Sequence, residues 1–132
     1  MEKRLTRVCV YGSLRAGMGN HSILSGSKYL GTTTTVEPYA MYSLGGFPMV
    51  SLEGVRMSPI VVEVYECDER TLSRLNMLEG YRGKGADNFY DCSEIQTGEG
   101  PALIYHIEDR VGRDPVPDGD WVSYCTQRNS RY

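Results

Sequence analysis

Only one stretch of this chain, between Asp68 and Gly80, has the sequence pattern of a helix. Asp68 is a favourable residue for the N-cap, and Glu69 suits the positive end of the helix dipole. Gly80 suits the left-handed conformation that commonly follows a last helical turn. A chain of 132 residues with one clear helix has to build most of its core from strands.

Short β-favouring segments occupy most of the remaining sequence. The predicted strands are 7–11, 29–36, 39–44, 47–52, 60–65, 89–95 and 102–107, with a helical turn at 21–24. Segment 109–120 is rich in proline, glycine and charge and is expected to be irregular. Trp121, Val122 and Tyr124 are expected to dock the C-terminal segment, and 126–132 is expected to be a loose tail. We therefore predict a single α+β domain over 1–132, a small, mostly antiparallel, barrel-like sheet with one main helix.

The composition argues against several classes of protein. A hydrophobic share of 40% and a charged share of 23% are typical of a globular chain, and a net charge of -3 disfavours nucleic acid as the main partner. The four cysteines form no C-x-x-C pair and are expected to be reduced. The N-terminal apolar stretch is too short for a signal peptide or a membrane span, so a cytoplasmic protein without a membrane partner is expected. The oligomeric state is left open.

The predicted helix carries a carboxylate on its apolar side. Glu79 lies seven residues after Leu72, which is about 20° short of two full turns, and Leu75 and Leu78 fall on the same face. Burial raises the pKa of a carboxyl group, and the negative end of the helix dipole acts in the same direction. Both effects favour a general acid/base near neutral pH. The alternative is a carboxylate at a fraying helix end that reaches solvent or pairs with Arg82.

The first predicted strand stops abruptly at Gly12-Ser13. Successive N–H groups in such a turn can form a nest for an anion, and glycine permits a close approach to the backbone. The spacing matches neither a phosphate-binding P-loop, nor a dinucleotide fingerprint, nor a nucleophile elbow. An ordinary strand-to-loop turn is the alternative. His21 and His106 have no evident partner cluster, so no metal site is predicted, while a Cys–His nucleophile stays open.

Three motifs resemble the gamma-glutamylcyclotransferase-like superfamily, and most closely its gamma-glutamylamine cyclotransferase and AIG2-like branch. The first is the segment VCVYGSLRAGMGNHSIL at 8–24, which carries the pattern Y-G-[ST]-L-[RK] and a following Asn at position 20. The second is LNMLEGY at 75–81, which is similar to the pattern L-x-x-x-E-G-Y. The third is Gly-Asp-Trp at 119–121. The motifs occur in the expected order and span most of the chain.

The resemblance implies both a fold and a reaction. Members of the superfamily have a small closed or nearly closed sheet with flanking helices and a polar cavity. They cyclise a gamma-glutamyl group to 5-oxoproline and release an amine or amino acid, with no cofactor and no metal. Glu79 is then expected to be the catalytic acid/base. The glutamyl part of the small-molecule substrate is expected to bind the backbone of Tyr11, Gly12, Ser13 and Leu14.

The segment after Glu79 departs from the pattern of this branch, which usually has a tyrosine soon after the acidic residue. Here Tyr90 follows an insertion at 83–88 and precedes Asp91, whereas Tyr81 comes almost directly after Glu79. Either tyrosine is a candidate for substrate contact, and the leaving-group preference stays open. Two alternatives to a cyclotransferase are a module that binds a small glutamyl-like anion without turnover and a different lyase or amidase that uses Glu79.

Overall fold

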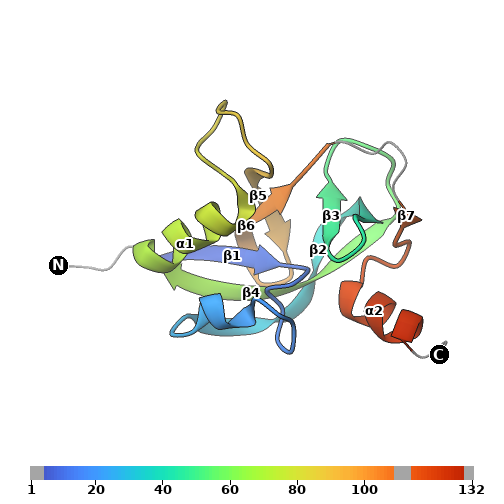
Figure 1. Cartoon of the computed structure of the whole chain (residues 1–132), viewed down its shortest axis with the longest axis horizontal. Helices are drawn as coiled ribbons and strands as arrows, with labels where there is room; N and C mark the ends of the chain where they lie inside the picture. Colours follow the sequence, from blue (N-terminus) through green and yellow to red (C-terminus); the bar gives the residue numbers. More distant parts are fainter. Residues whose placement is uncertain (1–4, 109–113, 130–132) are drawn as a thin grey trace.

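The computed structural model describes residues 5–108 and 114–129, which form seven strands, two helices and one 3₁₀ turn (Figure 1). The strands are β1 (Leu5–Val10), β2 (Lys28–Ser43), β3 (Pro48–Ser51), β4 (Ser58–Asp68), β5 (Asp91–Thr97), β6 (Gly100–His106) and β7 (Asp114–Pro115). The helices are α1 (Glu69–Glu79) and α2 (Trp121–Asn129), and the 3₁₀ turn is His21–Leu24. The turn predicted at 21–24 is confirmed.

The sheet closes on itself, which confirms the predicted barrel-like α+β fold. The strand order is β3-β2-β4-β1-β6-β5, and β5 returns to β2 through the pair Thr35↔Thr97. Five strands, β2, β4, β1, β6 and β5, therefore form the barrel. Only the pair of β1 and β6 is parallel, and the other pairs between the described strands are antiparallel.

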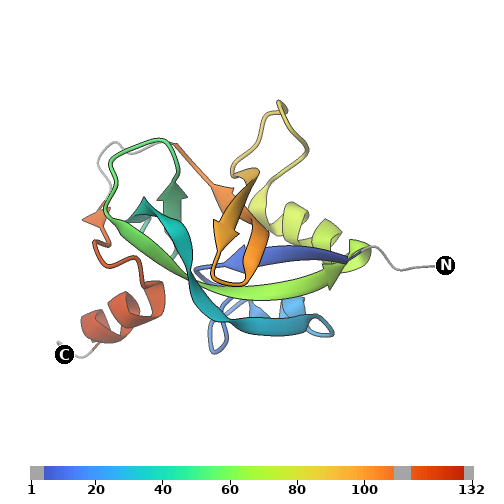
Figure 2. The same ribbon diagram turned by 180° about the vertical axis from the view of Figure 1, so that it is seen from behind.

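The main departure from the predicted strands is β2, which is one continuous strand where two, 29–36 and 39–44, were expected. It pairs with β4, β3, β5 and β7, and its register against β4 shifts between Tyr29 and Gly31 and again between Thr34 and Pro38. Pro38 lacks an N–H group and interrupts the ladder, which made a break between two strands a reasonable prediction. The chain bends there instead, so one strand follows the curvature of the barrel beside β4 (Figure 2).

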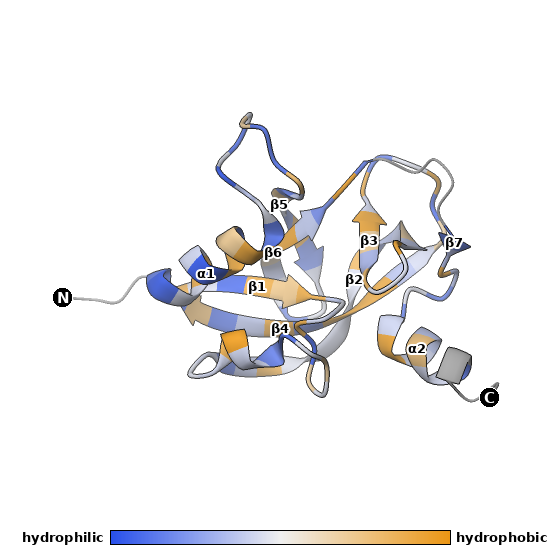
Figure 3. Cartoon of the chain, viewed as in Figure 1, coloured by the Kyte–Doolittle hydropathy of each residue, from blue (hydrophilic) through white to orange (hydrophobic). Residues whose placement is uncertain are grey.

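The second half of strand β1, residues 8–10, is buried on both faces, as its apolar run predicts. Val8 and Val10 belong to one buried cluster, together with Leu75 of α1. Cys9 belongs to a second cluster to which all five barrel strands contribute, so this cluster fills the barrel interior. In Figure 3 the end of β1 is coloured as hydrophobic and lies beside β4. The end of β1 is thus held firmly from both sides, and the loop that follows it begins from a rigid point.

Helix α1 begins and ends at the residues predicted for its caps. The Asp68 carboxylate accepts a hydrogen bond of 2.8 Å from the Thr71 N–H group. Gly80 adopts the left-handed conformation with φ of 68°, and its N–H group donates to Asn76 and Met77 carbonyl oxygens. These caps define where the helix stops, and so they determine the position of Glu79 in its last turn.

The C-terminal segment contains a second helix, which was not predicted beside the main helix α1. Helix α2 continues through Thr126 to Asn129, where a loose tail was expected. Asp120 Oδ1 accepts a hydrogen bond of 3.2 Å from the Ser123 N–H group, and Trp121 is only 2% exposed. This cap and this buried anchor stabilise the helix, which lies at the end of the molecule opposite α1 (Figure 1).

Parts of two predictions lie outside the described residues, namely 109–113 of the irregular segment and 130–132 of the expected tail. The remainder of the irregular segment includes the short strand β7, which pairs with β2. Neither helix of the described structure has the length and apolar character needed to cross a membrane.

Candidate active site

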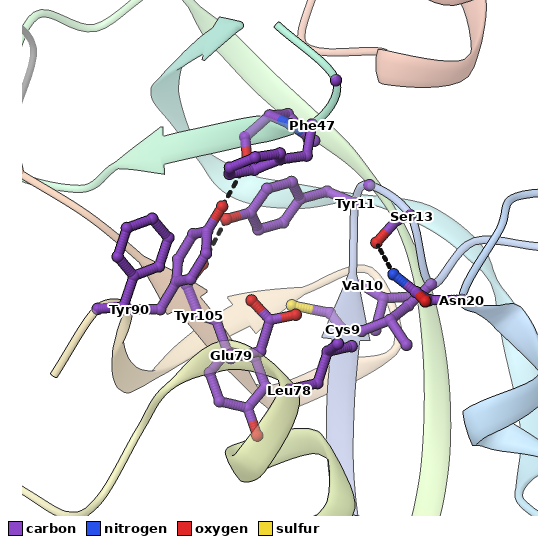
Figure 4. Close-up of a pocket in the computed structure, with 15 residues that line it drawn as sticks. Cys9, Val10, Tyr11, Ser13, Asn20, Phe47, Leu78, Glu79, Tyr90 and Tyr105 are labelled. Atoms are coloured by element: carbon purple, nitrogen blue, oxygen red, sulfur yellow. Dashed lines mark hydrogen bonds between the residues drawn. The ribbon is translucent and has the colours of Figure 1, made fainter. Parts of the chain in front are cut away.

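A pocket of about 350 Å³ opens where the ends of several elements meet (Figure 4). Its walls come from the end of β1, the end of α1, the turn between β2 and β3, and the residues just before β5. Glu79 and Tyr90 line it, and so does the loop after β1. The loop contributes Tyr11, Gly12, Ser13, Leu14 and Asn20. The structure therefore brings together the Gly12-Ser13 turn and Glu79, which are more than 60 residues apart in the sequence.

Glu79 is half-buried, and its carboxylate is turned into the pocket (Figure 4). Among the described residues, no ion pair with Arg82 and no hydrogen bond to the Glu79 carboxylate is present. Burial raises the pKa of this carboxyl to about 7. A carboxylate without a protein partner and with a pKa near neutrality can both accept and return a proton.

The loop after β1 presents backbone donors to the same pocket. The Arg15 N–H group donates to the Gly12 carbonyl at 3.0 Å and closes a tight turn. Within the described structure, the N–H groups of Ser13 and Leu14 have no acceptor. The Asn20 side-chain amide donates to Ser13 Oγ at 3.0 Å and holds the far end of the loop. Two free amide donors on residues that line a pocket can bind an anion or a polarised carbonyl oxygen.

Gly12 has a packing role that is visible only in the structure. A Cβ atom at this position would lie 2.7 Å from Pro48 Cγ. The missing side chain therefore lets the turn pack directly against the start of β3. Gly12 was predicted to permit the close approach of a ligand, and its contact with Pro48 is a separate reason for a glycine at this position.

A buried ion pair anchors this loop to the barrel. Arg15 Nε donates to Glu63 Oε2 at 2.9 Å, and the Ala16 N–H group donates to Glu63 Oε1 at 2.8 Å. Arg15 Nη1 also donates to Asp120 Oδ1 at 2.9 Å, next to the start of α2. Burial alone would raise the pKa of Glu63, but the Ala16, Arg15 and Tyr65 donors together lower the pKa of this carboxyl. This anchor could not be predicted, because no local sequence pattern links Arg15 to Glu63.

Three tyrosines line the pocket, and each has its hydroxyl group held by a hydrogen bond. Tyr11 donates to the Tyr105 carbonyl at 2.6 Å, and Tyr90 donates to the Pro48 carbonyl at 2.7 Å. Tyr105 donates to Asn76 Oδ1 of α1 at 2.6 Å. Burial, with a further contribution from Glu79 in each case, raises the pKa of all three phenols above the ordinary value. The three hydroxyls are therefore neutral at neutral pH, and each is already donated to another acceptor.

The structure distinguishes between the two tyrosines that the sequence left as candidates for substrate contact. Tyr90 lines the pocket, although it lies eleven residues after Glu79. The intervening loop is closed at its base by two backbone hydrogen bonds, from Phe89 to Gly80 at 3.0 Å and from Tyr90 to Glu79 at 3.2 Å. Tyr81 does not line the pocket and lies against the Tyr105 ring in a T-shaped contact, with 6.4 Å between ring centroids.

The structure gives no support to the Cys–His nucleophile. Cys9 lines the pocket, and burial raises the pKa of its thiol to about 12, so it is protonated at neutral pH. Neither histidine lines the pocket. His21 bonds to the Leu14 carbonyl at 2.9 Å, and His106 lies between Ser93 and Glu108. The described residues contain no group of three or more potential metal ligands.

Comparison with known proteins identifies the family. The model of the family described as gamma-glutamyl cyclotransferase, AIG2-like, matches residues 8–123, and the chain therefore belongs to this family. Family and relatives place the chain among gamma-glutamylcyclotransferase-like enzymes, which confirms the predicted family and enzyme class.

Two curated relatives and one solved structure illustrate the similarity. A Methanocaldococcus jannaschii protein, assigned provisionally by its name to the gamma-glutamylcyclotransferases, is 41% identical over 122 residues, covering 89% of this chain and 96% of that protein. The gamma-L-glutamyl-butirosin B gamma-glutamyl cyclotransferase of Niallia circulans is 30% identical over 128 residues, covering 92% and 78%. The crystal structure of an uncharacterized Pyrococcus horikoshii protein matches with a TM-score of 0.77 at 27% identity, covering 96% and 98%.

Proposed function

We propose that the protein converts a gamma-glutamyl amine or peptide to 5-oxoproline and releases the amine. The observation that carries this proposal is the unpartnered Glu79 carboxyl, whose pKa burial raises to about 7, in the same pocket as the free amides of Ser13 and Leu14. A relative whose name specifies gamma-L-glutamyl-butirosin B supports a gamma-glutamyl group as the part of the substrate that reacts.

The proposed reaction begins with the substrate's own α-ammonium group, which is inert while protonated. Glu79 accepts a proton from this nitrogen, and the freed amine attacks the γ-carbonyl carbon to close a five-membered ring. The bond between that carbon and the leaving nitrogen then breaks. Glu79 gives this first proton to the departing nitrogen as that bond breaks. The ring nitrogen, positively charged after the attack, loses its second proton to Glu79, which passes it to the released amine. Both protons lost by the α-nitrogen therefore end on the released ammonium group.

The pocket supports this reaction mainly by positioning. Because both reacting groups belong to one molecule, the enzyme has to fold the substrate so that nitrogen and carbonyl carbon meet. In the proposed complex the Ser13 and Leu14 amides bind the α-carboxylate or the developing charge on the carbonyl oxygen. The hydrogen-bonded Tyr11, Tyr90 and Tyr105 side chains give this pocket fixed walls. No enzyme nucleophile is required, consistent with the protonated Cys9 thiol.

The test is the formation of 5-oxoproline from gamma-glutamyl amines, followed by mass spectrometry. Glu79→Gln is expected to lower kcat/KM by about 100-fold or more, because the amide cannot take up the proton. Glu94→Gln is the matched control, since Glu94 is exposed on β5 and does not line the pocket. An unchanged rate in Glu79→Gln would overturn the mechanism. Calorimetric binding of the glutamyl compound without product in either protein would favour a binding module instead.

A further inference from the structure

Three exposed apolar side chains surround the mouth of the pocket. Phe47 is 39% exposed, Leu78 is 41% exposed and Phe89 is 60% exposed, and all three line the pocket. They come from the β2–β3 turn, the last turn of α1 and the residues before β5. The rings of Phe47 and Phe89 contact one another, with 6.5 Å between centroids. We call these three residues the apolar rim, and Figure 4 shows Phe47 and Leu78 on opposite sides of the pocket.

The apolar rim is built into the fold. The Phe89 N–H group donates to the Gly80 carbonyl at 3.0 Å, and a Cβ atom at Gly80 would lie 2.9 Å from Phe89 Cβ. Phe89 therefore occupies space that only a glycine at the end of α1 leaves open. Phe47 is followed directly by Pro48, whose carbonyl is held by the Tyr90 hydroxyl. Both rings are therefore attached to backbone that the pocket itself fixes, so the rim is largely formed before a substrate binds.

The charges of the pocket restrict what this rim can bind. Glu79 is the only charged residue among those that line the pocket in the described structure, and no lysine or arginine is among them. An amino acid or peptide leaving group would bring a carboxylate close to Glu79 with no cation to pair with it, which is costly in a partly desolvated site. An amine with an apolar substituent avoids that cost and covers exposed aromatic surface.

Resting on the proposed function, we propose that the apolar rim is the binding subsite for the leaving group and selects amines with an aromatic or branched alkyl substituent. In this arrangement the glutamyl part lies deep in the pocket, between the Ser13 and Leu14 amides and Glu79. The amide nitrogen points toward the mouth, and its substituent packs between Phe47, Leu78 and Phe89. The rim takes no part in bond making and acts on the choice of substrate alone.

The test compares three substrates that share the glutamyl part, namely gamma-glutamyl-benzylamine, gamma-glutamyl-methylamine and gamma-glutamyl-glycine. Formation of 5-oxoproline is measured by mass spectrometry. For the wild-type protein, kcat/KM is expected to be about tenfold or more higher for the benzyl than for the methyl compound, and lowest for the glycine compound. Free benzylamine is also expected to inhibit more strongly than methylamine, a measurement that needs no variant.

The double variant Phe47→Ser/Phe89→Ser is expected to lower the ratio of kcat/KM for the benzyl compound to kcat/KM for the methyl compound by about tenfold. Val36→Ser/Val55→Ser is the matched control, because both valines are exposed and do not line the pocket. Equal kcat/KM for benzyl and methyl compounds in the wild type, or a preference for the glycine compound, would overturn the subsite alone. If no substrate yields 5-oxoproline, the proposed function fails and the subsite fails with it.

Discussion

Glu79 is placed where an ionised carboxylate costs stability, which fits the proposed chemical role better than a structural one. Its carboxyl is half-buried with no hydrogen-bond partner among the described residues, so the folded protein holds an ionised group in an unfavourable place at neutral pH. The neighbouring Tyr11, Tyr90 and Tyr105 hydroxyls are all committed to other acceptors. A structural role alone would favour a neutral side chain at this position.

Replacing Glu79 by Gln is therefore expected to stabilise the protein at pH 8, by about 2 kcal/mol after allowance for its partial exposure. The carboxyl ionises near 4.5 in the unfolded chain and near 7 in the folded protein. Between these values the folded state keeps a proton that the unfolded state has lost, so wild-type stability falls as the pH rises through this window. The advantage of the variant is thus expected to grow from pH 5 to pH 8.

Urea unfolding at pH 5, 6.5 and 8 measures this effect, with Glu94→Gln as the exposed control that should track the wild type. A constant difference between Glu79→Gln and wild type across these pH values would mean that the folded carboxyl has an ordinary pKa. That result would also remove the acid/base argument for this residue.

For single residues, the position of Glu79 could be predicted, whereas the tyrosine that lines the same pocket could not be chosen between Tyr81 and Tyr90. The interval from Leu72 to Glu79 is two helical turns, and the caps at Asp68 and Gly80 delimit the helix, so the face follows from local rules. The choice of Tyr90 over Tyr81 depends on hydrogen bonds that close the intervening loop onto the end of α1. Such contacts join residues whose pairing has no periodic signal in the sequence.

Among the elements, the loop from Gly12 to Asn20 depends most on distant support. Its position relative to the barrel is determined by the pair of Arg15 and Glu63, both almost fully buried. The loop was predicted from its glycines and from its place after a buried strand. Its anchor was not predicted, because a charge pair between a loop and the middle of β4 leaves no local pattern.

Replacing Arg15 by Met is expected to destabilise the protein by about 3–5 kcal/mol, since the Glu63 carboxylate would remain buried without its cation. The double variant Arg15→Met/Glu63→Met removes both charges and is expected to recover part of this loss. Because the Ala16 N–H group still lacks its acceptor, the loop stays poorly held, and KM for a gamma-glutamyl amine is expected to rise more than kcat falls.

Urea unfolding and steady-state kinetics on the single and double variants measure these two effects. Arg56→Met is the control, because Arg56 pairs with Glu37 on the surface. An Arg15→Met protein within about 1 kcal/mol of wild type would show that the pair does not hold the loop.

At the scale of the whole molecule, the fold class could be predicted from the sequence, whereas features that depend on contacts across the closed barrel could not. Alternating and apolar runs indicated the strands and hence a mostly antiparallel, barrel-like sheet. The continuity of β2 and the presence of α2 depend on packing across the molecule, which a single sequence does not reveal. Pro38 reads locally as a strand break, and only the pairing of β2 with β4, β3 and β5 shows that the strand continues.

The second helix connects the far end of the molecule to the pocket. Trp121 lies in the buried cluster that fills the barrel, and it stacks on Tyr124 with 5.2 Å between ring centroids. The preceding residue, Asp120, binds Arg15, which in turn holds the loop of the candidate site. We therefore propose that the barrel, α2 and the loop unfold as one cooperative unit.

Trp121→Ala is accordingly expected to cost about 3–5 kcal/mol, because the cavity it leaves lies in the barrel core. It is also expected to weaken binding of a gamma-glutamyl amine, since displacement of α2 withdraws Asp120 from Arg15. Thr126→Ala is the control on the same helix, because Thr126 is exposed, and it should stay within about 0.5 kcal/mol of wild type. The wild-type chain contains one tryptophan, so its fluorescence in urea reports on this core directly. A fluorescence transition at lower urea than the loss of circular dichroism would mean that α2 detaches first, and the cooperative unit would have to be divided.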